Sequence, residues 1–166
     1  MGQELRIYAI RLGNGSQFWN DVAMPYQIAL AKTDAEIERC SGVMRQLRPH
    51  IAAAEFLPRV QRQLAQGYRL GVLQEHGEIK AVAGYRILEC LAWGKFLYVD
   101  DLVTRETDRS TGCGGALIDW LIAEAIREDC DEFHLDSGVQ RFRAHRFYLA
   151  KRLDITCHHF ALKLRG

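Results

Sequence analysis

Apolar positions recur along the chain with two spacings, one typical of strands and one typical of helices. Residues 96–103 are rich in β-branched and aromatic side chains, which favour an extended backbone. After a glycine-rich stretch, apolar residues repeat at every fourth position in two adjacent rows: Leu117, Leu121 and Ala125, then Ile118, Ile122 and Ile126. This spacing predicts a helix with one apolar face. The sequence therefore predicts a strand, a glycine-rich loop and a helix, in that order.

The same patterns divide most of the remaining chain. Thr33, followed by Asp34 and Glu36, is typical of a helix cap and first turn, and Pro49 ends that helix. The other predicted elements, in chain order, are a strand at 26–32, a helix at 33–47, a helix at 55–66, strands at 68–74 and 78–88 joined by a hairpin turn at His76-Gly77, a short strand around 133–135, a helix at 140–151 and a final strand within 154–164. We treat residues 1–24 as an N-terminal extension or extra strand and residues 25–166 as one domain.

Composition narrows the class of protein. The 166 residues carry a formal net charge of +1, which gives no reason to expect nucleic acid or an anionic membrane as partner. No apolar run approaches the roughly 20 residues that span a bilayer. The five cysteines are scattered without C-x-x-C spacing, which indicates reduced thiols in a cytoplasmic protein. The adjacent pair His158-His159 faces opposite sides of an extended chain, so no metal site is predicted.

The glycine-rich loop is the main candidate for chemistry. Residues 109–115 read Arg-Ser-Thr-Gly-Cys-Gly-Gly and precede the long helix, so backbone N–H groups and the positive helix end are available to bind an anion. No lysine follows Gly115, which excludes the nucleotide P-loop. The dinucleotide fingerprint is excluded as well, because it belongs to the first strand-to-helix turn of its fold and this loop lies in the C-terminal half of the chain. Cys113 lies at the predicted start of the helix, but no histidine context supports it as a nucleophile.

The loop matches the pattern Q/R-x-x-G-x-G/A at Arg109, Gly112 and Gly114. This resembles the acetyl-CoA pyrophosphate signature of the GNAT superfamily of N-acetyltransferases. About 30 residues downstream, Ala144, Phe147 and Tyr148 resemble that superfamily's Ala-x-x-Phe-Tyr segment. The phrase around Tyr148 is most similar to the branch that contains aminoalkylphosphonate and small-amine acetyltransferases. The resemblance covers roughly residues 26–164.

The resemblance implies a fold and a cofactor site. The fold would be a mixed α/β sheet of six to seven strands, strongly twisted, with helices on both faces. The donor would be acetyl-CoA, held where the fourth and fifth strands splay apart. The residues expected to hold it are Leu102, Val103, Thr104, Arg109, Thr111, Gly112, Cys113, Gly114 and Gly115. Relatives are commonly dimers, which makes a homodimer an expectation.

Three positions depart from the family pattern. Ser110 stands where glycine often follows the signature arginine, and Glu106 stands where proline is usual. Arg152-Leu153 replaces the Gly-Phe that often ends the fourth helix, so the chain is expected to leave that helix without a left-handed cap.

Acetyl transfer to an amine requires a neutral amine, a stabilised oxyanion and a proton for the departing thiolate. The resemblance makes Tyr148 the acid for the thiolate, although the same tyrosine could simply be part of an apolar helix face. Asp101 is the candidate base or ammonium-binding group, and Asp100 is expected on the opposite sheet face. Either carboxylate could instead merely pair with an arginine. The Leu102-Val103 backbone is the candidate oxyanion donor.

Three functions are consistent with these residues. The first is acetyl transfer from acetyl-CoA to a primary amine of a small molecule. The second is acetylation of protein N-termini or lysines, which needs a wider groove. The third is a non-catalytic acyl-CoA sensor with the same fold. The resemblance implies that acceptor specificity is set by the variable helices before residue 67.

Overall fold

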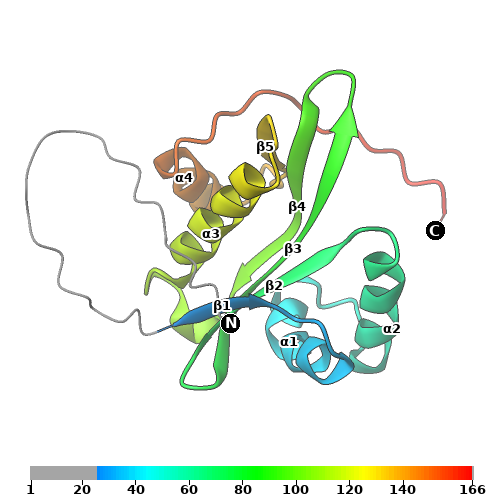
Figure 1. Ribbon diagram of the computed structural model, residues 1–166, viewed down its shortest axis with the longest axis vertical. Helices are drawn as coiled ribbons and strands as arrows, with labels where there is room; N and C mark the ends of the chain where they lie inside the picture. The colour runs from blue at the N-terminus through cyan, green and yellow to red at the C-terminus, as the bar shows by residue number, and fades with distance from the viewer. Residues whose placement is uncertain (1–25, 166) are drawn as a thin grey trace, which may run out of the picture.

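The structure is a computed structural model that describes residues 26–165. Its centre is a five-stranded mixed sheet in which sequence order and spatial order coincide. Helices cover both faces, as Figure 1 shows. The predicted fold class is confirmed. The N-terminal extension predicted for residues 1–24 lies outside the described residues.

Four antiparallel strands and one parallel strand form the sheet. Their bounds are β1 Gln27–Leu30, β2 Arg69–Glu75, β3 Glu78–Cys90, β4 Gly94–Thr104 and β5 Glu132–Leu135. β1 to β4 pair in antiparallel order, and β5 pairs with β4 in parallel. The turn between β2 and β3 has positive φ at both His76 (49°) and Gly77 (78°), the conformation of a two-residue hairpin turn. The predicted hairpin is therefore confirmed.

Four α-helices and one short 3₁₀ helix complete the fold. They are α1 Asp34–Leu47, α2 Ala53–Leu64, η1 Glu106–Asp108, α3 Cys113–Arg127 and α4 Phe142–Ala150. α1 begins with the capping box that the sequence predicts, in which Glu36 N donates to Thr33 Oγ1 at 3.3 Å and the Glu36 carboxylate accepts from Thr33 N. Among residues 26–165, no helix combines the length and hydropathy that a bilayer crossing requires.

The sheet separates two apolar cores. Side chains from α1 and α2, including the buried Ile37 and Phe56, pack against Val82 of β3 and its neighbours on one face. On the other face, Leu117 and Leu121 of α3 pack against a second cluster that lines the same strands. Alternating strand side chains supply both clusters, which is why β2 and β3 contain uninterrupted buried apolar runs at residues 70–73 and 81–85.

The final strand predicted within residues 154–164 is wrong. In the described part of the chain the sheet ends at β5, and the segment after α4 is extended without pairing. Its apolar side chains are exposed: Ile155, Phe160, Leu162 and Leu164. Alternating apolar residues identify a strand only when a neighbouring strand is present to pair with it, and the sequence pattern does not contain that information.

The expected exit from α4 is also corrected. Arg152 adopts a left-handed backbone with φ 64°, the conformation for which glycine is usual. Leu153 N donates to Tyr148 O at 3.1 Å and Arg152 N donates to Leu149 O at 3.0 Å. These two bonds are those of a Schellman cap. They satisfy carbonyl groups at the helix end, which offsets the cost of about 1–2 kcal/mol for a left-handed residue with a side chain.

Candidate functional site

The N-terminus of α3 is open toward an anion. Its N-cap is Gly112, with φ 96°, and no side chain among the described residues caps the helix. The first turn contains no acidic residue. The amides at Cys113, Gly114 and Gly115 therefore keep the unpaired positive character of a helix start. This is the geometry that the glycine pattern predicts for a phosphate site.

The loop before α3 is held by its own contacts. Thr111 Oγ1 donates to Asp108 O at 2.6 Å, which directs this side chain back toward η1. Ser110 has φ 67°, so the serine adopts the conformation that glycine often provides at this position in the family. Arg109 is half-exposed and lies 3.6 Å from Glu106 (Nη1 to Oε1), a loose pairing that leaves its guanidinium available to a ligand.

Cys113 and Gly114, at the start of α3, lie close to other parts of the fold. Cys113 is buried in the α3 core cluster, and its Sγ lies 3.3 Å from Thr111 Oγ1. Its thiol belongs to the core, which agrees with the weak sequence support for a nucleophile. At Gly114, an added Cβ would lie 2.8 Å from Thr104 Oγ1 and 4.0 Å from Phe147 Cζ. The loop, the end of β4 and α4 therefore meet at Gly114, where a Cβ would require the Thr104 side chain to shift.

The sheet opens beside this loop. β5 pairs with β4 only from Phe96 to Val99, whereas β4 continues to Thr104. On its other edge β4 remains paired with β3, with Leu102 opposite Ala83 and Val103 opposite Val82. Among the described residues, the edge of β4 that faces β5 therefore has no pairing partner beyond Val99, because β5 ends at Leu135. Leu102 and Val103 lie in the part of β4 that β5 does not cover.

Tyr148 lies on α4 at the same end of the sheet. Its ring is partly buried and lies 5.4 Å from the ring of Phe147, between centroids. Burial raises the pKa of the Tyr148 phenol above its ordinary value, and the charge of Arg141 opposes the shift. The phenol therefore keeps its proton at neutral pH.

A bulge in β4 corrects the predicted orientation of the two acids. Gly84 pairs with Asp101 and Tyr85 pairs with Val99, so Asp100 is an extra residue in the strand. The extra residue interrupts the alternation of side chains. Asp100 and Asp101 consequently both lie on the face covered by α1 and α2, and the prediction that they face opposite sides is wrong.

Asp101 is bound by two donors from distant parts of the chain. Arg48 Nε donates to Oδ1 at 2.7 Å, and the Tyr68 hydroxyl donates to Oδ2 at 3.0 Å. Arg48 also donates to the carbonyl of Asp100 at 3.0 Å. The alternative that Asp101 pairs with an arginine is therefore confirmed, and this pairing coexists with a partly accessible carboxylate, 13% exposed.

Asp100 has its own arginine. Arg86 Nε donates to Asp100 Oδ2 at 2.8 Å, and the same guanidinium donates to Gln63 of α2. Burial raises the pKa of the Asp100 carboxyl, and the hydrogen bond from Arg86 opposes this. The guanidinium carbon of Arg86 also lies 5.5 Å from the centroid of the Tyr68 ring.

Sequence patterns did not identify Arg48, Tyr68 or Arg86. Arg48 follows the last residue of α1, and Tyr68 precedes β2, so both looked like element boundaries. Their partner Asp101 is 53 and 33 positions away. No local spacing signals a contact over such separations.

The histidines near the C-terminus have structural contacts. His145 Nε2 lies 3.0 Å from Gly138 O, which ties α4 to the turn before it rather than to Tyr148. His159 Nδ1 lies 3.0 Å from Asp136 Oδ2. Arg143 and Arg146 are exposed on α4, as expected for a solvated face.

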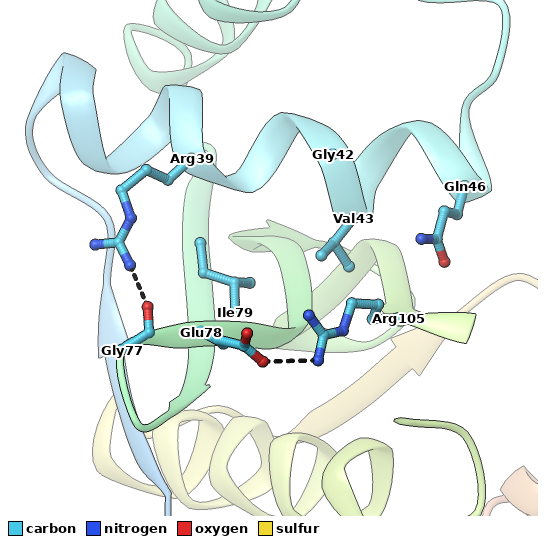
Figure 2. A pocket seen from close by; sticks show the side chains of 8 residues that line it. All are labelled: Arg39, Gly42, Val43, Gln46, Gly77, Glu78, Ile79 and Arg105. Carbon is cyan, nitrogen blue, oxygen red and sulfur yellow. Dashed lines mark hydrogen bonds and ion pairs between the residues drawn. The ribbon is translucent and has the colours of Figure 1, made fainter. Parts of the chain in front are cut away.

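A separate cavity of about 450 Å³ lies between α1, the β2–β3 turn and the end of β4 (Figure 2). Its arginines are engaged by the protein: Arg39 donates to Gly77 O at 2.6 Å, and Arg105 pairs with Glu78 at 3.0 Å. None of the site residues predicted from the sequence lines it. The cavity is therefore distinct from the α3 site.

Comparison with known proteins identifies relatives of the chain. The family model described as "Acetyltransferase (GNAT) family" matches residues 34–153. The uncharacterized N-acetyltransferase YhdJ of Bacillus subtilis is 33% identical over 110 residues, which cover 66% of this chain and 78% of that protein.

Solved structures with much lower identity share the fold. The aminoglycoside N-acetyltransferase AAC(6')-Iy, in complex with a bisubstrate analogue that contains CoA, superimposes with a TM-score of 0.74 at 14% identity, covering 85% of this chain and 99% of its own. Glucosamine-6-phosphate N-acetyltransferase from Arabidopsis thaliana superimposes with a TM-score of 0.68 at 18% identity, covering 84% and 99%.

Proposed function

Because the chain belongs to the GNAT family of acetyltransferases, we propose that it transfers the acetyl group of acetyl-CoA to a primary amine of a small molecule. The observation that carries the proposal is the open N-terminus of α3, which lies beside the uncovered part of β4 and against α4. An anion site, a free strand edge and a phenol at one end of the sheet are what such a reaction needs.

The residues of the α3 loop fit a diphosphate. The amides from Thr111 to Gly115 would bind its oxygens, and Arg109 would supply the positive charge. Glycine at 112 and 114 lets the backbone approach the ligand closely. Thr104, whose hydroxyl points toward Gly114, would lie along the arm that connects the diphosphate to the thioester.

Residues of β4 and α4 would assist the chemistry. Acetyl-CoA supplies an acyl group activated as a thioester. The backbone N–H groups around Leu102 and Val103 would stabilise the oxyanion, since β5 leaves this part of the strand uncovered. The phenol of Tyr148 would protonate the departing thiolate, and its raised pKa keeps that proton available.

Asp101 would bind the ammonium group of the acceptor or take its proton. An ionised carboxylate offers about four acceptor positions, and Arg48 and Tyr68 occupy one on each oxygen. The remaining positions can hold a cation. An alkyl ammonium with a pKa of about 10.4 is neutral in only about one molecule in a thousand at pH 7, so a nearby base assists attack.

The acceptor is proposed to be a small amine. The resemblance of the sequence around Tyr148 to the branch with aminoalkylphosphonate and small-amine acetyltransferases is one reason for this proposal. The names of two structural relatives, an aminoglycoside and a glucosamine-6-phosphate N-acetyltransferase, describe acceptors of the same general kind, small molecules with a primary amine.

The proposal is tested by thiol release from acetyl-CoA across a panel of small amines, amino acids, aminophosphonates and lysine peptides. Release with a small amine supports it. Release with peptides alone would indicate a protein acetyltransferase, and tight CoA binding without release would indicate a sensor. Calorimetry of CoA binding to the wild type and to Arg109→Ala tests the loop, and weaker binding by the variant is expected.

A further inference from the structure

We propose that Tyr68 and Arg48 are positioning residues for acetyl transfer, which fix the Asp101 carboxylate and the β4 bulge for the incoming amine. This role rests on the proposed function, in which Asp101 meets the acceptor. Neither residue belongs to the loop or to α4. Arg48 lies between α1 and α2, directly after the last residue of α1, and Tyr68 lies between α2 and β2.

Tyr68 is built into the site. Its side chain is buried, and its hydroxyl donates to Asp101 Oδ2 at 3.0 Å. A Cβ at Gly84, the residue opposite Asp101 in β3, would lie 1.8 Å from this hydroxyl. The phenol therefore reaches the carboxylate only because position 84 has no side chain. Burial, followed by the neighbouring Asp101 charge, raises the pKa of Tyr68 well above its ordinary value, so the phenol remains a donor.

Arg48 holds two groups at once. Its Nε donates to Asp101 Oδ1 at 2.7 Å, and its Nη2 donates to the backbone carbonyl of Asp100 at 3.0 Å. The second bond attaches the end of α1 to the bulged residue itself. The planar guanidinium thus fixes the bulge carbonyl and the neighbouring carboxylate in one relative geometry.

Together the two donors remove the freedom of the Asp101 carboxylate to rotate, since each oxygen has a donor from a different element. The neighbouring charged groups Asp100 and Arg86 pair with each other. Asp101 is the acid whose orientation depends on both α1 and the residue before β2. A misplacement of about 1 Å in such a group can cost about 100-fold in rate.

The experiment compares Tyr68→Phe and Arg48→Gln with the wild type in steady-state kinetics and in CoA calorimetry. Both variants are expected to lower kcat/KM for the amine by about 10-fold to 100-fold, with the CoA dissociation constant unchanged. Arg48→Lys, which keeps the charge, should recover part of the loss.

Tyr85→Phe is the matched control, because the Tyr85 hydroxyl lies 3.4 Å from a Glu124 oxygen on the α3 face. It removes a phenol near a carboxylate without touching the bulge, so kcat/KM for the amine should stay at the wild-type value. Active wild type, with Tyr68→Phe indistinguishable from Tyr85→Phe and Arg48→Gln unchanged, would overturn the positioning role. Arg48 is 41% exposed, so its variants decide the matter if Tyr68→Phe does not fold. If the wild type releases no thiol with any amine, that result would instead contradict the proposed acetyl transfer.

Discussion

The phenol of Tyr148 combines two properties that a proton donor to a thiolate needs. It lies partly buried on α4, and burial raises its pKa above its ordinary value of about 10. A donor with a raised pKa is active below that pKa and is lost as the pH rises through it. If deprotonation of Tyr148 lowers turnover at high pH, this decline should therefore lie above about pH 10.

The substitution Tyr148→Phe is expected to lower turnover by about 10²- to 10⁴-fold, the range for a single proton-transfer group. CoA affinity and folding should change little, because phenylalanine keeps the ring that packs near Phe147. The measurement is kcat with saturating amine, with CoA calorimetry on the same preparation. Full turnover would assign the proton to another group, such as water.

Residue patterns predicted some of the site and missed the rest for a physical reason. Tyr148 and the glycines belong to local motifs, and the motif alone indicates them. The bonds from Arg48 and Tyr68 to Asp101 exist only because the sheet brings distant segments together. The bulge at Asp100 is equally invisible in the sequence, because an inserted residue in a strand looks like any other residue.

At the scale of elements, the start of α3 depends on its close fit to β4. In Gly114→Ala, the added Cβ would lie 2.8 Å from Thr104 Oγ1, tighter than a normal contact. We expect the free energy of unfolding to fall by about 1 kcal/mol, because an overpacking cost of about 1–3 kcal/mol exceeds the gain in helix propensity. CoA binding should weaken as the loop shifts.

Gly115→Ala provides the comparison for stability. Its Cβ would meet only the flexible end of Lys151, at 3.5 Å, which is an ordinary contact. Alanine there should be neutral or stabilising in thermal unfolding, because it favours the helix. If the two variants melt at the same temperature, the fit between Gly114 and Thr104 does not constrain the loop.

Element boundaries followed local chemistry closely where that chemistry was sufficient. The Thr33 cap and the His76-Gly77 turn lie where the sequence predicts them, since their hydrogen bonds involve neighbouring residues. The strand predicted within residues 154–164 depended on a partner strand, and the prediction was wrong. Arg152 shows that a left-handed cap also forms without glycine when its hydrogen bonds are available.

At the scale of the whole molecule, a cluster of charges connects β3, the end of β4 and the loop before α3. Arg105 bonds to Asp108 and to Glu78, and Lys80 lies within 3.4 Å of Asp108. The hydrogen bond from Arg105 is the main cause that lowers the pKa of Asp108, to about 2. Asp108 O in turn accepts from Thr111, so the cluster supports the loop before α3.

This cluster predicts an acid dependence of stability. The folded-state pKa of Asp108 is depressed, so its contribution is present above the unfolded value of about 3.9 and is lost as the pH falls toward about 2. Urea unfolding between about pH 5 and pH 2 should show this decline, and Asp108→Asn should flatten it. The exposed Asp154→Asn is the control. An unchanged slope in Asp108→Asn would show that other carboxyl groups govern acid unfolding.

The fold class could be predicted from the sequence, whereas the strand count could not. Helices on both faces of a mixed sheet agree with the expectation, but residues 26–165 form five strands instead of six to seven. The interior strands were predictable because burial on both faces gives them long apolar runs. The edge strands β1 and β5 also lie where the sequence predicts them. The count fails at the strand predicted within residues 154–164, which has no partner strand.

The bulge in β4 has a consequence for how this strand tolerates change in length. Val99 and Leu102 lie toward α3, while the two aspartates between them share the other side. At the bulge, two residues of β4 occupy the place of one in β3. Deleting one of the two aspartates would therefore restore regular pairing, and every later side chain of β4 would stay on its present face of the sheet. β4 can thus gain or lose one carboxylate at the bulge without exchanging the two faces of its later residues.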